Sequence, residues 1–230
     1  MKSKITQEAA AGRETTERLL DTAERLFGEH GYDGVGMRLL AEAAKVNLGA
    51  ATYHFGSKQA LYVATIMRRL RPVNAERLRL LRTAQALARG RPLLVDTIVE
   101  CMVRPPYVLG LEHPDFHTLL ARALFMPPPF LEAVLHAELD PSDEVFVAAL
   151  RRSLGKVPVD LIHLRVTFSM GALLMFSVRM SKLRPQRHAK FDASLLQEVI
   201  RVIAAGLQSA PAVPPDEWPP NPRPSQAPRG

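Results

Sequence analysis

The chain has 230 residues, 47% of them hydrophobic, so it can hold one large domain or two modest ones with a real core. Its single cysteine excludes an internal disulfide framework and a cysteine-based zinc cluster. The net charge of +7 at pH 7 favours an anionic partner, nucleic acid first and a membrane surface second. Because no run alternates with a strict period of two, we expect an all-helical protein.

The N-terminal segment has no apolar core of the kind that secretory signals carry, which favours a cytoplasmic protein. Residues 1–12 are expected to form a flexible arm. A helix is predicted over residues 15–30, because its apolar side chains fall on one stripe. Gly31 lies just past its end, where a left-handed cap costs least.

Two short helices follow. The first is predicted over residues 37–44, with Gly36 as a weak N-cap. The second begins after Asn47, a strong N-cap whose side-chain oxygen is expected to accept the N–H of Ala50. The dipeptide Gly56-Ser57 ends this helix and caps the next one.

Three short helices with a tight turn between the second and third describe a helix-turn-helix unit. The third helix would pack inward through Val46, Ala51 and Phe55. Its other side carries small residues that would let the backbone enter the DNA major groove, which is about 12 Å wide. The outward side chains expected to meet DNA are Gly49, Ala50 and Thr52, with Tyr53, Lys58 and Arg38 close to phosphates or a guanine edge.

The stretch "ERLLDTAERLFGEHGYDGVGMRLLAEAAKVNLGAATYHFGSKQALY" resembles the DNA-binding domain of the TetR family of bacterial transcriptional regulators. The resemblance covers about residues 15–65 and includes Leu26-Phe27, Gly31-Tyr32 and Tyr53-His54-Phe55 followed by Ser57-Lys58. The full set of DNA-binding residues that it implies is Met37, Arg38, Asn47, Leu48, Gly49, Ala50, Thr52, Tyr53, His54 and Lys58.

Three positions depart from the family pattern. Lys45 stands where glycine is commoner, Gly36 where serine or threonine usually caps, and Thr52 where tyrosine is frequent. Residues 46–58 and 68–81 also look similar to a branch that includes fatty-acid-responsive regulators.

After the third short helix, further helices are expected with proline-bearing joints between them. A helix from residue 58 should break or kink at Pro72 and resume to residue 87. The others are predicted over residues 92–103, 116–125, 130–139, 143–154, 159–180 and 193–208. The stretch 161–178 is apolar, but His163 and Arg165 interrupt it, so a buried core helix is favoured over a membrane span. Residues 210–230 are proline-rich and expected to be disordered.

The resemblance implies two helical domains, a DNA-binding domain over residues 13–65 and a ligand-binding and dimerisation domain over residues 66–209. Dimerisation is expected through residues 159–180 and 193–208, which would present two third helices to a palindromic operator. An apolar or amphipathic small molecule would release the DNA, and no cofactor is implied. The rivals are a constitutive DNA-binding dimer and a helical carrier or enzyme, although no catalytic constellation supports an enzyme.

Several side chains are candidates for lining a small-molecule cavity, each with ordinary core packing as its alternative. Arg122 and Arg165 lie in apolar helices and would pair with an acidic ligand group if they point inward. The candidate ligand residues are Met102, Phe116, Arg122, Phe125, Arg165, Phe168 and Met175.

Two further groups invite a function. The arginines between residues 68 and 91 have few acidic neighbours in sequence, so a solvated face is favoured over phosphate binding. The segment "EHPDFH" brings Glu112, His113, Asp115 and His117 together, but Pro114 disfavours a helical histidine pair, and we expect no metal.

Overall fold

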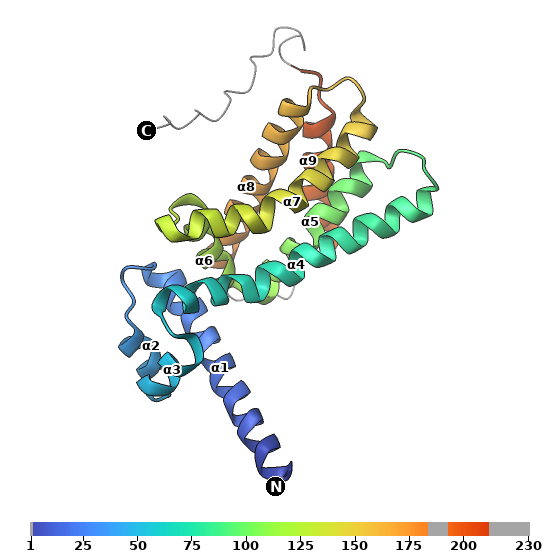
Figure 1. Cartoon of the computed structure of the whole chain (residues 1–230). Helices are drawn as coiled ribbons and strands as arrows, with labels where there is room; N and C mark the ends of the chain where they lie inside the picture. Colours follow the sequence, from blue (N-terminus) through green and yellow to red (C-terminus); the bar gives the residue numbers. More distant parts are fainter. Residues whose placement is uncertain (1, 184–192, 212–230) are drawn as a thin grey trace, which may run out of the picture.

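The computed structural model describes residues 2–183 and 193–211 (Figure 1). Over these residues the chain forms helices and no strand, which confirms the predicted all-α class. The helices are α1 Lys2–His30, α2 Met37–Ala43, α3 Leu48–Phe55, α4 Lys58–Ala88, α5 Val95–Glu112, α6 Pro114–Phe125, α7 Pro129–Leu154, α8 Val159–Leu183 and α9 Ala193–Gln208. Most of the predicted proline-rich tail lies outside the described residues.

Helices α1, α2 and α3 gather at one end of the molecule, and α4 runs from that end along the bundle of α5 to α9 (Figure 1). The small unit has its own core, in which Leu19 of α1 packs with Ala41, Ala44 and Ala51. A second core joins α1 to the bundle through Phe27, Phe116 and Leu119 among others. The unit of α1, α2 and α3 and the bundle of α5 to α9 are therefore packed on each other.

Close approach between α1 and α6 depends on Gly28. A Cβ atom at this position would lie 3.1 Å from the carbonyl oxygen of Asp115 and 3.5 Å from the amide nitrogen of Leu119. Any larger residue would push the two helices apart.

Several predicted boundaries were wrong. The helix predicted over residues 92–103 is α5, which begins at Val95 and continues through Pro105 and Pro106 to Glu112. The first helix begins at Lys2, so residues 2–12 are helical where a loose arm was expected, in keeping with the helix formers in "TQEAAA". Pro72 and Pro141 lie inside α4 and α7 and do not end them. Each proline costs a helical hydrogen bond, but apolar side chains buried on both sides, such as Leu70 and Leu81, hold α4 continuous.

Helix α8 is less buried than predicted. It is long and apolar enough to cross a membrane, yet only 33% of its apolar window is buried in the protein. Leu164, Phe168 and Met175 are exposed along one side, while Ile162 and Leu173 pack into the core. The expected core helix therefore leaves an apolar stripe uncovered.

Candidate nucleic-acid interface

Helix α3 is held to the small unit by one side only, as the sequence predicted. Ala51 is fully buried, and Val46 and Phe55 pack against the core that contains Leu19 and Ala41. The side chain of Ala51 is small, which brings the α3 backbone close to α1 and α2.

The opposite side of α3 faces solvent. Gly49, Thr52, Tyr53 and His54 are all exposed, and Tyr53 has 87% of its surface accessible. The Tyr53 ring packs edge-on against His54, with ring centres 5.6 Å apart. The exposed side of α3 thus consists of backbone and short side chains, with the large aromatic ring of Tyr53 near its C-terminal end.

The N-terminus of α3 is capped differently from the prediction. The side-chain oxygen of Asn47 accepts the N–H of Gly49 at 2.6 Å, whereas the expected donor was Ala50. The donor lies only two residues after Asn47, so the Asn47 side chain lies close against the first turn of α3. A Cβ at Gly49 would lie 3.1 Å from that oxygen, so glycine at this position makes room for the cap. The next helix is capped as predicted, because the Ser57 hydroxyl accepts the N–H of Ala60 at 3.1 Å.

The turn between α2 and α3 contains a residue in the left-handed region. Lys45 has a φ of 54°, a conformation that glycine adopts at low cost and other residues rarely adopt. This explains why lysine is a departure from a pattern that favours glycine here.

Lys58, which was predicted to contact a DNA phosphate, contacts Tyr32 within the protein. Its Nζ donates to the carbonyl oxygen of Tyr32 at 3.1 Å and lies 4.0 Å from the centre of the Tyr32 ring. The side chain therefore fixes the loop after α1 to the start of α4. Arg38 is exposed in the first turn of α2 and forms none of the ion pairs found among the described residues.

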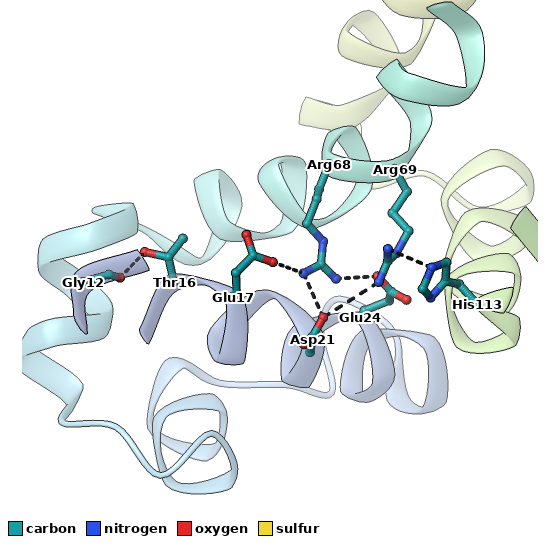
Figure 2. Close-up of polar contacts among 8 residues, drawn as sticks. All are labelled: Gly12, Thr16, Glu17, Asp21, Glu24, Arg68, Arg69 and His113. Atoms are coloured by element: carbon teal, nitrogen blue, oxygen red, sulfur yellow. Dashed lines mark hydrogen bonds and ion pairs between the residues drawn. The ribbon is translucent and has the colours of Figure 1, made fainter. Parts of the chain in front are cut away.

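A cluster of charges ties α1 to α4, shown in Figure 2. Glu24 is buried and accepts from Arg68 Nη2 at 2.7 Å and from Arg69 Nε at 2.8 Å. Arg68 also pairs with Asp21 at 2.8 Å. Burial opposes the charge of Arg68, but its bonds to Glu24 and Asp21 outweigh burial and raise its pKa. These two arginines were expected on a solvated face, and that expectation was wrong because their acidic partners lie about 45 residues earlier in the chain.

The same cluster reaches the joint between α5 and α6. Arg69 Nη1 lies 3.1 Å from Nε2 of His113 (Figure 2). Because a guanidinium can only donate, His113 accepts through Nε2. His113 is thus part of the contact between the helical bundle and the unit of α1, α2 and α3.

The bundle encloses a cavity of about 340 Å³, here called the bundle cavity, between α4, α5, α6, α7 and α8. Its wall is mostly apolar, with Leu70, Leu120 and Leu174 among its lining residues. The polar side chains in the wall are Asn74, Arg77, His117, Asp143 and Thr167. The size falls within the range of about 300–1,000 Å³ that small-molecule sites occupy.

The predicted ligand residues divide between the cavity and other locations. Phe116 and Phe125 line the bundle cavity. Met102 is fully buried in the core and does not line it, while Phe168 and Met175 are exposed on α8. The structure brings together only part of the predicted set.

Neither arginine that was expected to point at a ligand does so. Arg122 donates to the carbonyl oxygens of Gly28 at 2.8 Å and Glu29 at 3.1 Å, at the end of α1. Arg165 donates to the carbonyl oxygens of Leu207 at 2.8 Å and Ser209 at 2.9 Å, at the end of α9. Both satisfy carbonyls that a helix C-terminus leaves without donors.

The sequence analysis did not predict the polar residues that line the bundle cavity. A signal existed on α4, where Leu70, Asn74, Arg77 and Leu81 are buried at a helical spacing. Two polar residues on an otherwise apolar stripe indicate a buried polar site. In the "EHPDFH" segment, Nε2 of His113 contacts Arg69, whereas Nδ1 of His117 is buried without a hydrogen-bond partner. The described residues contain no group of three or more potential metal ligands.

Two family descriptions match most of the chain. The N-terminal part, residues 19–65, matches the bacterial regulatory proteins of the tetR family. Residues 100–206 match the tetracyclin repressor-like C-terminal domain.

Curated relatives share the N-terminal part. The HTH-type transcriptional repressor AcnR of Corynebacterium glutamicum is 43% identical over 58 residues, which are 24% of this chain and 31% of that protein. The HTH-type transcriptional regulatory protein RaaS of Mycobacterium tuberculosis is 48% identical over 44 residues, 19% of this chain and 20% of that protein. The chain thus matches less than a third of the length of these relatives.

Solved structures share the fold over nearly their full length. The TetR family regulator PfmR from Thermus thermophilus aligns with a TM-score of 0.58 at 24% identity, covering 83% of this chain and 97% of that one. A TetR-like regulator from a Rhodococcus species aligns with a TM-score of 0.59 at 21% identity, covering 85% and 97%.

Proposed function

Because the chain belongs to the TetR family of bacterial regulatory proteins, we propose that it is a transcriptional repressor that binds a palindromic DNA operator as a homodimer. It acts as a soluble protein of the cytoplasm. A small molecule in the bundle cavity releases it from DNA. Relatives that share its N-terminal part carry the name of HTH-type transcriptional repressors.

The observation that carries this proposal is the outward side of α3. Gly49, Thr52 and Tyr53 are exposed on a helix that is anchored by Ala51 from behind. Small residues allow the helix backbone to approach base edges, and the Thr52 methyl group can contact a thymine methyl. The Tyr53 hydroxyl can reach a phosphate, which fixes the register of the helix on the duplex.

Dimerisation is proposed through α8 and α9. Leu164, Phe168 and Met175 form the exposed apolar stripe of α8, and Val202 is exposed on α9. An uncovered stripe of this kind favours burial against a second copy. One short helix reads few base pairs, so two copies are needed for tight and specific binding.

Release by a ligand is proposed through α4 and α6, which line the cavity and also hold α1. Leu70 and Arg77 of α4 line the cavity, and Arg68 and Arg69 of the same helix bind α1. A ligand that favours a different position of α4 would shift the spacing of the two α3 helices. The similarity to fatty-acid-responsive regulators stays a prediction.

The decisive experiment selects bound duplexes from a random DNA pool with the purified full chain. We expect a palindrome whose half-sites are about one helical turn apart, with affinity that falls steeply as salt rises. Failure to retain any duplex at low salt would contradict the proposal and favour a ligand carrier. Operator binding that no small molecule weakens would support the constitutive dimer.

A further inference from the structure

The bundle cavity has a polar end made by two opposite charges. Arg77 on α4 is only 3% exposed, and its Nη2 donates to Oδ1 of Asp143 on α7 at 3.2 Å. Its Nη1 donates to Oδ1 of Asn74 at 2.9 Å, and its guanidinium carbon lies 4.9 Å from the centre of the Phe146 ring. The guanidinium is therefore held in place and its charge is balanced by Asp143.

His117 is the third titratable side chain in the cavity wall. Its ring lies against Gly110 of α5, where a Cβ would come within 2.4 Å of the imidazole. Burial lowers the pKa of His117 to about 4, although a hydrogen bond to the Pro106 backbone opposes the shift. The ring is neutral at neutral pH.

These side chains leave the described cavity wall without net charge. A charged ligand group would enter an apolar space in which no opposite charge is available. Such a group would lose its hydration, and the Arg77–Asp143 pair, whose charges cancel, would not compensate that loss with a net opposite charge, which disfavours binding. The apolar wall, in contrast, favours a hydrocarbon body.

One carboxylate oxygen remains as an acceptor at the polar end, and two buried nitrogen atoms of lining residues, Arg77 Nε and His117 Nδ1, have no hydrogen-bond partner among the described residues. Asp143 uses Oδ1 for Arg77, and its Oδ2 takes part in none of the hydrogen bonds found among the described residues. The Asp143 side chain is 39% exposed, so a ligand can reach it. A hydroxyl group can donate to this oxygen without bringing a charge.

From this geometry we infer that the bundle cavity takes an uncharged, mostly apolar molecule with one hydroxyl-type donor, in preference to a carboxylate or ammonium of the same skeleton. The inference rests on the proposed role of the cavity as the ligand site and specifies the ligand class. Arg77 and Asp143 set the preference together, because each cancels the charge of the other.

The test uses three probes with one carbon skeleton: 1-octanol, octanoate and octylammonium. Their binding to the full chain is measured by titration calorimetry at pH 7.5 and constant ionic strength. We expect 1-octanol to bind at least ten-fold more tightly than either ion. Equal or tighter binding of octanoate or octylammonium would overturn the inference, and so would binding of none of the three.

Charge variants test the cause of the preference. Asp143→Asn leaves Arg77 without its carboxylate, and octanoate should then bind at least ten-fold more tightly than to the unaltered chain. Glu144→Gln is the matched control, because Glu144 is the neighbouring carboxylate, is 68% exposed and does not line the cavity. It should leave the order of the probes unchanged.

If folded Asp143→Asn, verified by circular dichroism, keeps the original order, the charge balance does not set the preference. Arg77→Gln is a second test. It removes the cation that pairs with Asp143, so this variant should bind octylammonium more tightly than the unaltered chain does. Operator binding measured without any probe tests the proposed DNA-binding function separately, so the two claims fail independently.

Discussion

The guanidinium of Arg122 on α6 donates to the carbonyl oxygen of Gly28 on α1 at 2.8 Å. This bond joins a helix that lines the bundle cavity to the last turn of the helix that supports α3. Gly28 also permits the close packing of α1 on α6. The contact connects the wall of the bundle cavity to the unit formed by α1, α2 and α3.

We expect Arg122→Ala to lower the free energy of unfolding by about 1.5–3 kcal/mol, the usual range for hydrogen bonds to a charged group. Amide exchange at the end of α1 and in the following loop should rise, as measured by mass spectrometry. Arg165→Ala is the matched control, because Arg165 satisfies carbonyls at the end of α9 in the same manner. It should leave exchange near Gly28 unchanged; an equal rise in both variants would contradict a local role for Arg122.

Lys45→Gly should stabilise the protein. Lys45 holds a φ of 54°, and relief of that strain outweighs the added freedom of glycine in the unfolded chain, for a net gain of about 0.5–1 kcal/mol. Urea unfolding measures the change. Lys45→Ala removes the same charge but keeps the strain, so a gain of equal size in that variant would show that charge, and not backbone conformation, is responsible.

His117 should make stability depend on pH. Its pKa is about 4 in the folded protein against 6.5 for an ordinary histidine. Between these values the unfolded chain binds a proton that the folded chain does not, so stability falls as pH drops through this window. The full loss amounts to about 3 kcal/mol at pH 4. Comparing urea unfolding at pH 7 and pH 4.5 should give a smaller loss for His117→Gln, and an identical loss would refute the assignment.

Phe168→Glu should convert the proposed α8–α9 dimer to a monomer. Phe168 is 77% exposed at the middle of the α8 stripe, where a second copy would bury it. A carboxylate there would lose its hydration without a partner. Sedimentation measures the molar mass, and Leu87→Glu is the control, because Leu87 is also 77% exposed but lies at the far end of α4. A dimer that survives Phe168→Glu would require another interface.

The sequence predicted the ends of α3, the start of α4 and the inward position of Ala51 well, because their determinants are local. Asn47, Gly56 and Ser57 act within one helical turn, and the inward position of Ala51 follows from helical spacing. The C-terminal helices were less predictable. Pro72 and Pro141 look like helix ends in isolation, but tertiary packing carries both helices through them.

The polar residues of the bundle cavity could not be paired from the sequence alone. Arg77 and Asp143 are 66 residues apart, and only the packing of α4 on α7 brings them together. Arg122 and Arg165 were recognised as unusual in apolar helices, yet their partners are backbone carbonyls, which no residue type reveals.

The most direct test of DNA reading by α3 is the affinity of the Thr52→Ala/Tyr53→Ala double variant for the selected palindrome, measured by fluorescence anisotropy beside the unaltered chain. Both side chains are exposed, so the melting temperature should not change. We predict an affinity loss of at least 100-fold, about 2.7 kcal/mol. Unchanged affinity in a folded, dimeric double variant would contradict the assignment of α3 as the DNA-reading helix.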